Sequence, residues 1–188
     1  MTTSAPETSE RLITGSELAA MGNIGRCELV EGRIIPMSST GSEGMHGFVE
    51  AALGAALLDY VRRCKIGRVG VGEVGVYTRR NPDTVRGMDV FFISNERYAQ
   101  RTSRSFLDVA PELIAEVLSP EDSWSGVMQK IREYFEIGAR LVWIVDPQAR
   151  RVYAYRSMTD VREFTDVDEL PGDDVLPGFS VPVAALFE

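Results

Sequence analysis

The strongest indication of the fold lies in residues 111–147, PELIAEVLSPEDSWSGVMQKIREYFEIGARLVWIVDP. Its first part, ELIAEVL (112–118), is an apolar run of strand length, and a Ser-Pro pair stops it. From about Ser123 to Ile137 apolar residues recur at helical spacing, and Gly138 supplies a common helix end. RLVWIVD (140–146) is a second apolar strand. The stretch therefore predicts a strand, a helix and a further strand.

Segments on both sides of this stretch extend the pattern. They predict a short helix at 16–22, a β-hairpin at 26–37, a loop at 38–44, a long helix at 45–63, strands at 68–78 and 86–94, a polar Arg-rich loop, a strand at 150–156 that completes a hairpin with 140–146, and a last apolar cluster at 176–187. This order is typical of an α/β fold in which helices flank a mixed sheet, here preceded by an N-terminal hairpin.

The long helix should present an apolar face to this sheet. Six residues fall near one side at helical spacing: Phe48, Ala52, Ala55, Ala56, Leu58 and Val61. We expect these side chains to be the buried ones.

Length and composition indicate one ordinary globular unit. The chain has 188 residues, of which 44% are hydrophobic and 26% are charged. We expect a disordered lead at 1–15 and a single domain at 16–188. No apolar run is long enough to span a membrane, and the polar, acidic start does not resemble a signal peptide. Cys27 and Cys64 are far apart, so two free thiols in the cytoplasm are expected.

The charge distribution is uneven. The chain carries a net charge of −8, which opposes unspecific binding to nucleic acid. Residues 60–105 nevertheless contain ten Arg and Lys against four acids, so this segment is about +6 and the remainder about −14. Arginines spread over solvated loops are the more common explanation of such a cluster. The alternative is a local basic face on an acidic protein.

Two acidic residues interrupt apolar strands. Asp89 lies within MDVFFI (88–93), and Glu116 lies within LIAEVL (113–118). A buried carboxylate is costly unless it is paired or binds a metal. Either acid alone is more simply a residue at a strand end facing solvent. If the two strands are neighbours, both carboxylates can converge on one cation, and oxygen ligands of this kind suit Mg²⁺ or Mn²⁺.

Lys130 lies beside the apolar face of the helix predicted at 123–137. Its stem is long enough to carry the ammonium toward the ends of the strands. A lysine lying along the surface is the simpler interpretation of this residue. However, the chain has only one other lysine, Lys65, among its twenty basic residues, and lysine differs from arginine in titration and geometry.

Several motifs together resemble a known family. ELVEG (28–32), a histidine at the start of the long helix, RGMDV (86–90) and the stretch 111–147 are similar to those of the Uma-two family of candidate restriction endonucleases, within the PD-(D/E)XK nuclease superfamily. The similarity covers roughly residues 26–187. It implies a restriction-endonuclease-like fold and the Mg²⁺-dependent cleavage of phosphodiester bonds in DNA.

This resemblance assigns roles to individual residues. The aspartate of the PD motif falls on Asp89, and Met88 replaces its proline. The acid of the (D/E)XK motif falls on Glu116, but Leu118 stands where the lysine is expected. In this family the lysine is displaced onto the following helix, where it falls on Lys130. The loss of the proline affects the shape of the backbone and removes no ligand.

The resemblance also extends the candidate site beyond these three residues. Asp89 and Glu116 would hold Mg²⁺ or Mn²⁺ together with the backbone carbonyl of Val117. Glu28, in the opening hairpin, would supply another carboxylate. His46, the only histidine, would be a neighbour of the metal or a proton shuttle. A histidine that only caps or packs at a helix start is the structural alternative.

Two other hypotheses stay open at this point. The chain could be a catalytically inactive binding or interaction module that keeps the nuclease fold, which the net acidity and the lost proline favour. It could also be a homodimer whose pairing assembles a basic groove. The apolar strand at 140–146 and the C-terminal cluster are the candidate interface in that case.

Overall fold

The computed structural model describes residues 11–37 and 44–188. Residues 1–10 of the predicted lead and 38–43 of the predicted loop lie outside the described residues. From Ile13 onward the backbone is tied to the fold, because the Ile13 N–H donates to the Gly32 carbonyl at 2.9 Å. Thr14 then caps helix α1 (Gly15–Ala20) by accepting a hydrogen bond from the backbone N–H of Glu17.

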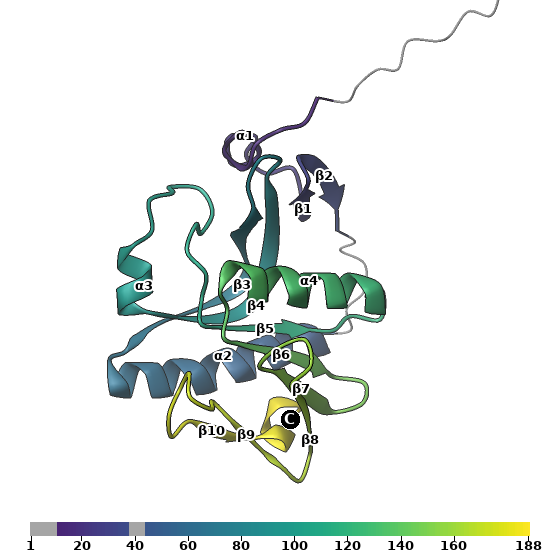
Figure 1. The fold of residues 1–188 in the computed structure, drawn as a ribbon. Helices are drawn as coiled ribbons and strands as arrows, with labels where there is room; N and C mark the ends of the chain where they lie inside the picture. Colours follow the sequence, from purple (N-terminus) through teal and green to yellow (C-terminus); the bar gives the residue numbers. More distant parts are fainter. Residues whose placement is uncertain (1–10, 38–43) are drawn as a thin grey trace, which may run out of the picture.

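A mixed β-sheet forms the centre of the described molecule (Figure 1). Its strands are β1 (Cys27–Val30), β2 (Arg33–Pro36), β3 (Gly67–Arg79), β4 (Thr84–Ser94), β5 (Leu113–Val117), β6 (Leu141–Asp146), β7 (Arg151–Tyr155) and β8 (Val161–Thr165). They pair in the order β2-β1-β4-β5-β6-β7-β8, and β3 pairs with β4. The β5–β6 pair is parallel and the other pairs described are antiparallel. The predicted fold class and the N-terminal hairpin are confirmed.

Two helices cover opposite faces of the sheet, as Figure 1 shows. α2 (Met45–Cys64) packs on one face with alternate residues of β4, β5 and β6, such as Val90, Ala115 and Trp143. α4 (Trp124–Ile137) packs on the other face with intervening residues such as Ile114 and Ile144. Because side chains alternate across a strand, near-continuous apolar strands are required when both faces are buried.

The predicted apolar face of α2 is confirmed at Val61 but is wrong at Phe48 and Ala55, which are exposed. Phe48 is 67% exposed, whereas Val49, Leu53, Leu57 and Val61 are at most 1% exposed. These four aliphatic side chains repeat at every fourth position and form one stripe. Alanine side chains bury little apolar area, so they do not determine which side of the helix faces the core. The larger aliphatic side chains bury more area and determine it.

Small elements missed by the sequence complete the fold. α3 (Asn95–Ala99) begins the segment predicted as an Arg-rich loop, and β9 (Glu169–Pro171), β10 (Ser180–Pro182) and the 3₁₀ helix η1 (Val183–Leu186) form the C-terminal region. The C-terminal apolar cluster packs into the α2-side core, and β6 lies inside the sheet. Neither therefore offers its apolar side chains to a partner chain, contrary to the interface considered above. In the described part of the chain, no helix is both long and apolar enough to cross a membrane.

Candidate active site

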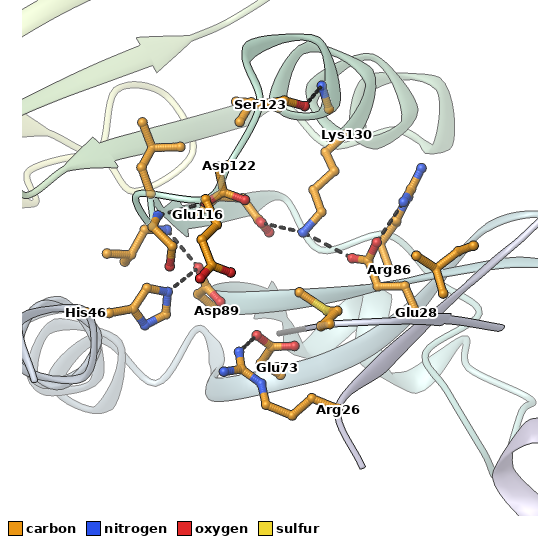
Figure 2. Close-up of a pocket in the computed structure, with 18 of the residues that line it drawn as sticks. Arg26, Glu28, His46, Glu73, Arg86, Asp89, Glu116, Asp122, Ser123 and Lys130 are labelled. Atoms are coloured by element: carbon orange, nitrogen blue, oxygen red, sulfur yellow. Dashed lines mark hydrogen bonds and ion pairs between the residues drawn. The ribbon is translucent and has the colours of Figure 1, made fainter. Parts of the chain in front are cut away.

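A pocket of about 460 Å³ opens where the β1–β2 hairpin, the start of α2, β4, the end of β5 and α4 meet. All the side chains proposed from the sequence line it: Glu28, His46, Asp89, Glu116 and Lys130, together with Val117. Figure 2 shows the side chains of Glu28, His46, Asp89, Glu116 and Lys130 pointing toward one another from separate elements. The structure thus brings together residues that lie up to 102 positions apart in the sequence.

Asp89 and Glu116 stand side by side at the end of the β4–β5 pair. The last paired positions are Val90 and Ala115, so continuing the antiparallel register places Asp89 opposite Glu116. Both acids are buried, at 5% and 7% exposure. The Val117 N–H donates to Asp89 Oδ2 at 2.7 Å. Since the N–H and C=O of a strand residue point to the same side, the Val117 carbonyl is also directed toward Asp89.

Glu116 is held in an environment that disfavours its charge. Burial raises the pKa of Glu116 to about 8, against the opposing charge of Lys130. The Tyr134 hydroxyl donates to Glu116 Oε1 at 2.8 Å and fixes its orientation. A nearby cation would lower this pKa, because positive charge stabilises the ionised form of a carboxyl group.

Lys130 extends from α4 between two carboxylates. Its Nζ lies 3.0 Å from Glu116 Oε2 and 3.0 Å from Glu28 Oε1. Burial of the ammonium opposes its charge, but the two carboxylates outweigh burial and raise the pKa of Lys130. Lys130 is therefore a fixed cation and hydrogen-bond donor near neutral pH.

Glu28 is fully engaged by neighbouring groups. Besides Lys130, its Oε1 accepts from the Gly87 N–H at 3.3 Å, and its Oε2 accepts from Arg86 Nη1 at 2.7 Å. Arg86 also makes two hydrogen bonds to Glu133, at 2.7 and 2.8 Å. In this arrangement both carboxylate oxygens of Glu28 have partners, and one of these partners is the Lys130 ammonium. The sequence analysis missed Arg86, although a buried cation within an otherwise apolar strand was a usable signal.

His46 contacts Asp89 from the α2 side. Its Nε2 lies 3.4 Å from Asp89 Oδ2, and this interaction raises the pKa of His46. Its Nδ1 lies 4.0 Å from the carboxylate of Glu50. Burial raises the pKa of Glu50. Glu50 was also missed from the sequence, where its position four residues after a histidine was the available signal.

The pocket is acidic, and of the ten basic residues in segment 60–105 only Arg86 lines it. Its described lining holds six carboxylates (Glu28, Glu73, Asp89, Glu116, Glu121 and Asp122) but three cationic side chains (Arg26, Arg86 and Lys130). Arg79 and Arg80 do not line it, and they pair instead with Glu31 and Asp83. A phosphate could not approach this excess of negative charge unless a cation first offset it.

Comparisons with known proteins identify the fold and the family. The Uma2 family, described as "Putative restriction endonuclease", matches residues 11–184. A crystal structure described as "a putative nuclease belonging to DUF820" from Anabaena variabilis ATCC 29413 has the same fold, with a TM-score of 0.76 and 21% sequence identity. The similarity covers 93% of this chain and 97% of that one. No curated protein matches the chain.

Proposed function

The chain belongs to the Uma2 family, and from this membership and the pocket we propose that it is a metal-dependent endonuclease that hydrolyses phosphodiester bonds in DNA. The observation that carries the proposal is the meeting of Asp89 and Glu116 at the end of two paired strands, with the Lys130 ammonium 3.0 Å from Glu116. Two carboxylates can hold a divalent cation, and a lysine beside them can stabilise negative charge that develops on a phosphate.

The donor atoms at this position fit a hard divalent cation. Asp89, Glu116 and the Val117 carbonyl would supply oxygen ligands, which suit Mg²⁺ or Mn²⁺. The excess of carboxylates in the lining supports the same conclusion, because a divalent cation offsets two of these charges. When bound, the cation would lower the pKa of a water molecule and stabilise charge on the phosphate.

Lys130 acts on the reacting groups as a positive hydrogen-bond donor. Its raised pKa keeps the ammonium charged, so it does not remove the proton from the attacking water. It would instead orient this water and stabilise negative charge developing on a phosphate oxygen. The water oxygen forms the new bond to phosphorus, a water proton passes to solvent, and the departing sugar oxygen takes a proton from solvent.

The surrounding network positions these groups. Glu28 and Glu116 hold the Lys130 ammonium from two sides, and Tyr134 fixes the second oxygen of Glu116. Arg86 offsets the charge of Glu28 and is itself fixed by Glu133. Glu28 is therefore proposed as a positioning residue for Lys130 and not as a ligand.

A plasmid-nicking assay tests this function. Wild type should relax supercoiled DNA with Mg²⁺ or Mn²⁺ and should lose this activity in EDTA. Asp89→Asn should be inactive, whereas Asp59→Asn, an exposed acid on α2, should be as active as wild type. Equal activity in all three proteins would trace the cleavage to a contaminant and refute the proposal. Tight DNA binding without cleavage would favour the inactive interaction module.

A further inference from the structure

The α2 side of the pocket holds a group of metal-ligating side chains that the proposed mechanism does not use in full. Ligand atoms of His46, Glu50 and Asp89 lie within 4.8 Å of one another. Asp89 is buried, and the side chains of His46 and Glu50 are 15% and 16% exposed. Atoms bound to one cation at about 2.1 Å are separated by about 3–4 Å, so small side-chain movements would close this group around an ion.

The local structure presets this arrangement. His46 and Glu50 stand one turn apart on α2, and this spacing places both on the same side of the helix. The Val117 N–H fixes Asp89 by donating to its Oδ2 at 2.7 Å. The group therefore depends on three elements of the core and not on a mobile surface segment.

Two cationic side chains of the pocket, Lys130 and Arg86, form their ion pairs with carboxylates outside this group. Lys130 is paired with Glu28 and Glu116, and Arg86 is paired with Glu28 and Glu133. Within the part of the chain that the structure describes, the ion pairs of Glu50 and of Asp89 are made with His46. Two carboxylates thus share one imidazole, which is charged only when protonated. The Arg26 guanidinium also acts on His46 and Glu50, but it is paired with Glu73.

We propose that His46, Glu50 and Asp89 form a second cation site, selective for a divalent transition-metal ion over Mg²⁺. Imidazole nitrogen is a good ligand for transition metals, whereas Mg²⁺ prefers oxygen ligands and retains its water. Asp89 would be shared with the cation beside Glu116, since the oxygens of one carboxylate can bridge two ions about 4 Å apart. The inference rests on the proposed function for this first cation, but binding at His46 and Glu50 is measurable without any cleavage.

Calorimetric titration of the EDTA-treated full chain with Mn²⁺, and separately with Mg²⁺, tests the second site. Wild type should bind two Mn²⁺ but one Mg²⁺ per chain. His46→Gln and Glu50→Gln should each reduce Mn²⁺ binding to one ion and leave Mg²⁺ binding unchanged. Asp59→Asn, with its carboxylate on the exposed side of the same helix, is the matched control and should behave as wild type.

The outcomes separate this inference from the nuclease proposal. Suppose that wild type binds one Mn²⁺, and that this binding is lost in Glu116→Gln but kept in Glu50→Gln. The second site is then refuted, and the cation site at Glu116 is supported. If Glu50→Gln binds one ion fewer and Glu116→Gln binds as many as wild type, the second site is supported. The cation site proposed for the nuclease at Glu116 is then refuted. Unchanged Mn²⁺ binding in His46→Gln and Glu50→Gln overturns the inference.

A measurement on wild type covers the case in which these variants do not fold. His46 is the only histidine, so ¹⁵N-histidine labelling gives the NMR signals of a single imidazole. Diamagnetic Zn²⁺ should shift one ring nitrogen strongly, and a tenfold excess of Mg²⁺ should not reverse the shift. Ring nitrogens that do not move at saturating Zn²⁺ would contradict the site.

Discussion

At the scale of single residues, the half-buried ammonium of Lys130 lies where the proposed mechanism would develop negative charge. Lys130 is fixed by Glu116 and Glu28 at 3.0 Å each, so little reorganisation is needed when a phosphate enters. A fixed donor of this kind lowers the barrier more than it strengthens binding of the ground state.

Lys130→Ala should therefore reduce kcat for DNA cleavage by about 100-fold or more, with a much smaller change in DNA affinity. Single-turnover cleavage and fluorescence anisotropy on the same duplex would separate the two quantities. Lys65→Ala, which removes the only other lysine at an exposed position, is the control. Equal losses of affinity and turnover in Lys130→Ala would show that Lys130 only binds DNA.

The raised pKa of Glu116 makes stability depend on pH in the absence of metal. Because the pKa is about 8 in the folded chain against an ordinary 4.5, the folded state binds a proton that the unfolded state has lost over this window. The stabilisation is complete below about pH 4.5 and is lost as pH rises through 8.

Thermal unfolding in EDTA should show this loss. The melting temperature of wild type relative to that of Glu116→Gln should fall between pH 5 and pH 8, and Mg²⁺ should reverse much of the fall at pH 8. Circular dichroism at three pH values provides the measurement. If the melting temperatures of the two proteins change in parallel with pH, burial does not raise the pKa of Glu116.

At the scale of elements, apolar patterning predicts the strands and helices well because burial dictates it. β5, α4 and β6 lie within one or two residues of their predicted bounds, with Ser123 and Gly138 as the caps of α4. Patterning predicts the bounds of α2 but misplaces part of its buried face, because alanines obscured the stripe formed by Val49, Leu53 and Leu57. The small elements near the C-terminus are also missed, because tertiary packing and not local periodicity defines them.

The buried stripe of α2 gives a direct test of this correction. Leu53→Ala should cost about 2–5 kcal/mol of unfolding free energy, because Leu53 is fully buried in the core. Phe48→Ala should change stability by less than about 0.5 kcal/mol, because Phe48 is 67% exposed. Urea unfolding measures both values. A larger loss of unfolding free energy in Phe48→Ala than in Leu53→Ala would show that the face predicted from the sequence is the buried one.

The candidate site was predictable only in part. Asp89 and Glu116 stand out because each interrupts an apolar strand, and Lys130 because it lies beside the apolar face of the next helix. The family resemblance adds Glu28, His46 and Val117. Arg86 and Glu50 carry local signals, but which side chains they contact depends on tertiary packing. The contact of Lys130 with Glu28, for example, joins α4 to the N-terminal hairpin across 102 positions.

At the scale of the whole molecule, charge opposes the proposed substrate. The chain has a net charge of −8, and carboxylates outnumber cationic side chains in the pocket lining. DNA binding should therefore depend on a divalent cation in the site and weaken with salt.

Ca²⁺, an oxygen-seeking cation, provides a way to measure this dependence separately from Mg²⁺-driven cleavage. Wild type should bind a duplex about tenfold or more tightly in Ca²⁺ than in EDTA at matched ionic strength, a change of about 1.4 kcal/mol or more. Asp89→Asn should show no such gain. Fluorescence anisotropy gives the affinities. Binding that is equally tight in EDTA and Ca²⁺ would show that the basic side chains suffice.

Anomalous diffraction from a crystal containing Mn²⁺ would locate the proposed cation without reference to activity. We expect a peak about 2.2 Å from carboxylate oxygens of both Asp89 and Glu116, with the Val117 carbonyl as a further ligand and Lys130 beside it. A well-ordered pocket with no peak between Asp89 and Glu116 at millimolar Mn²⁺ would refute the proposed metal site.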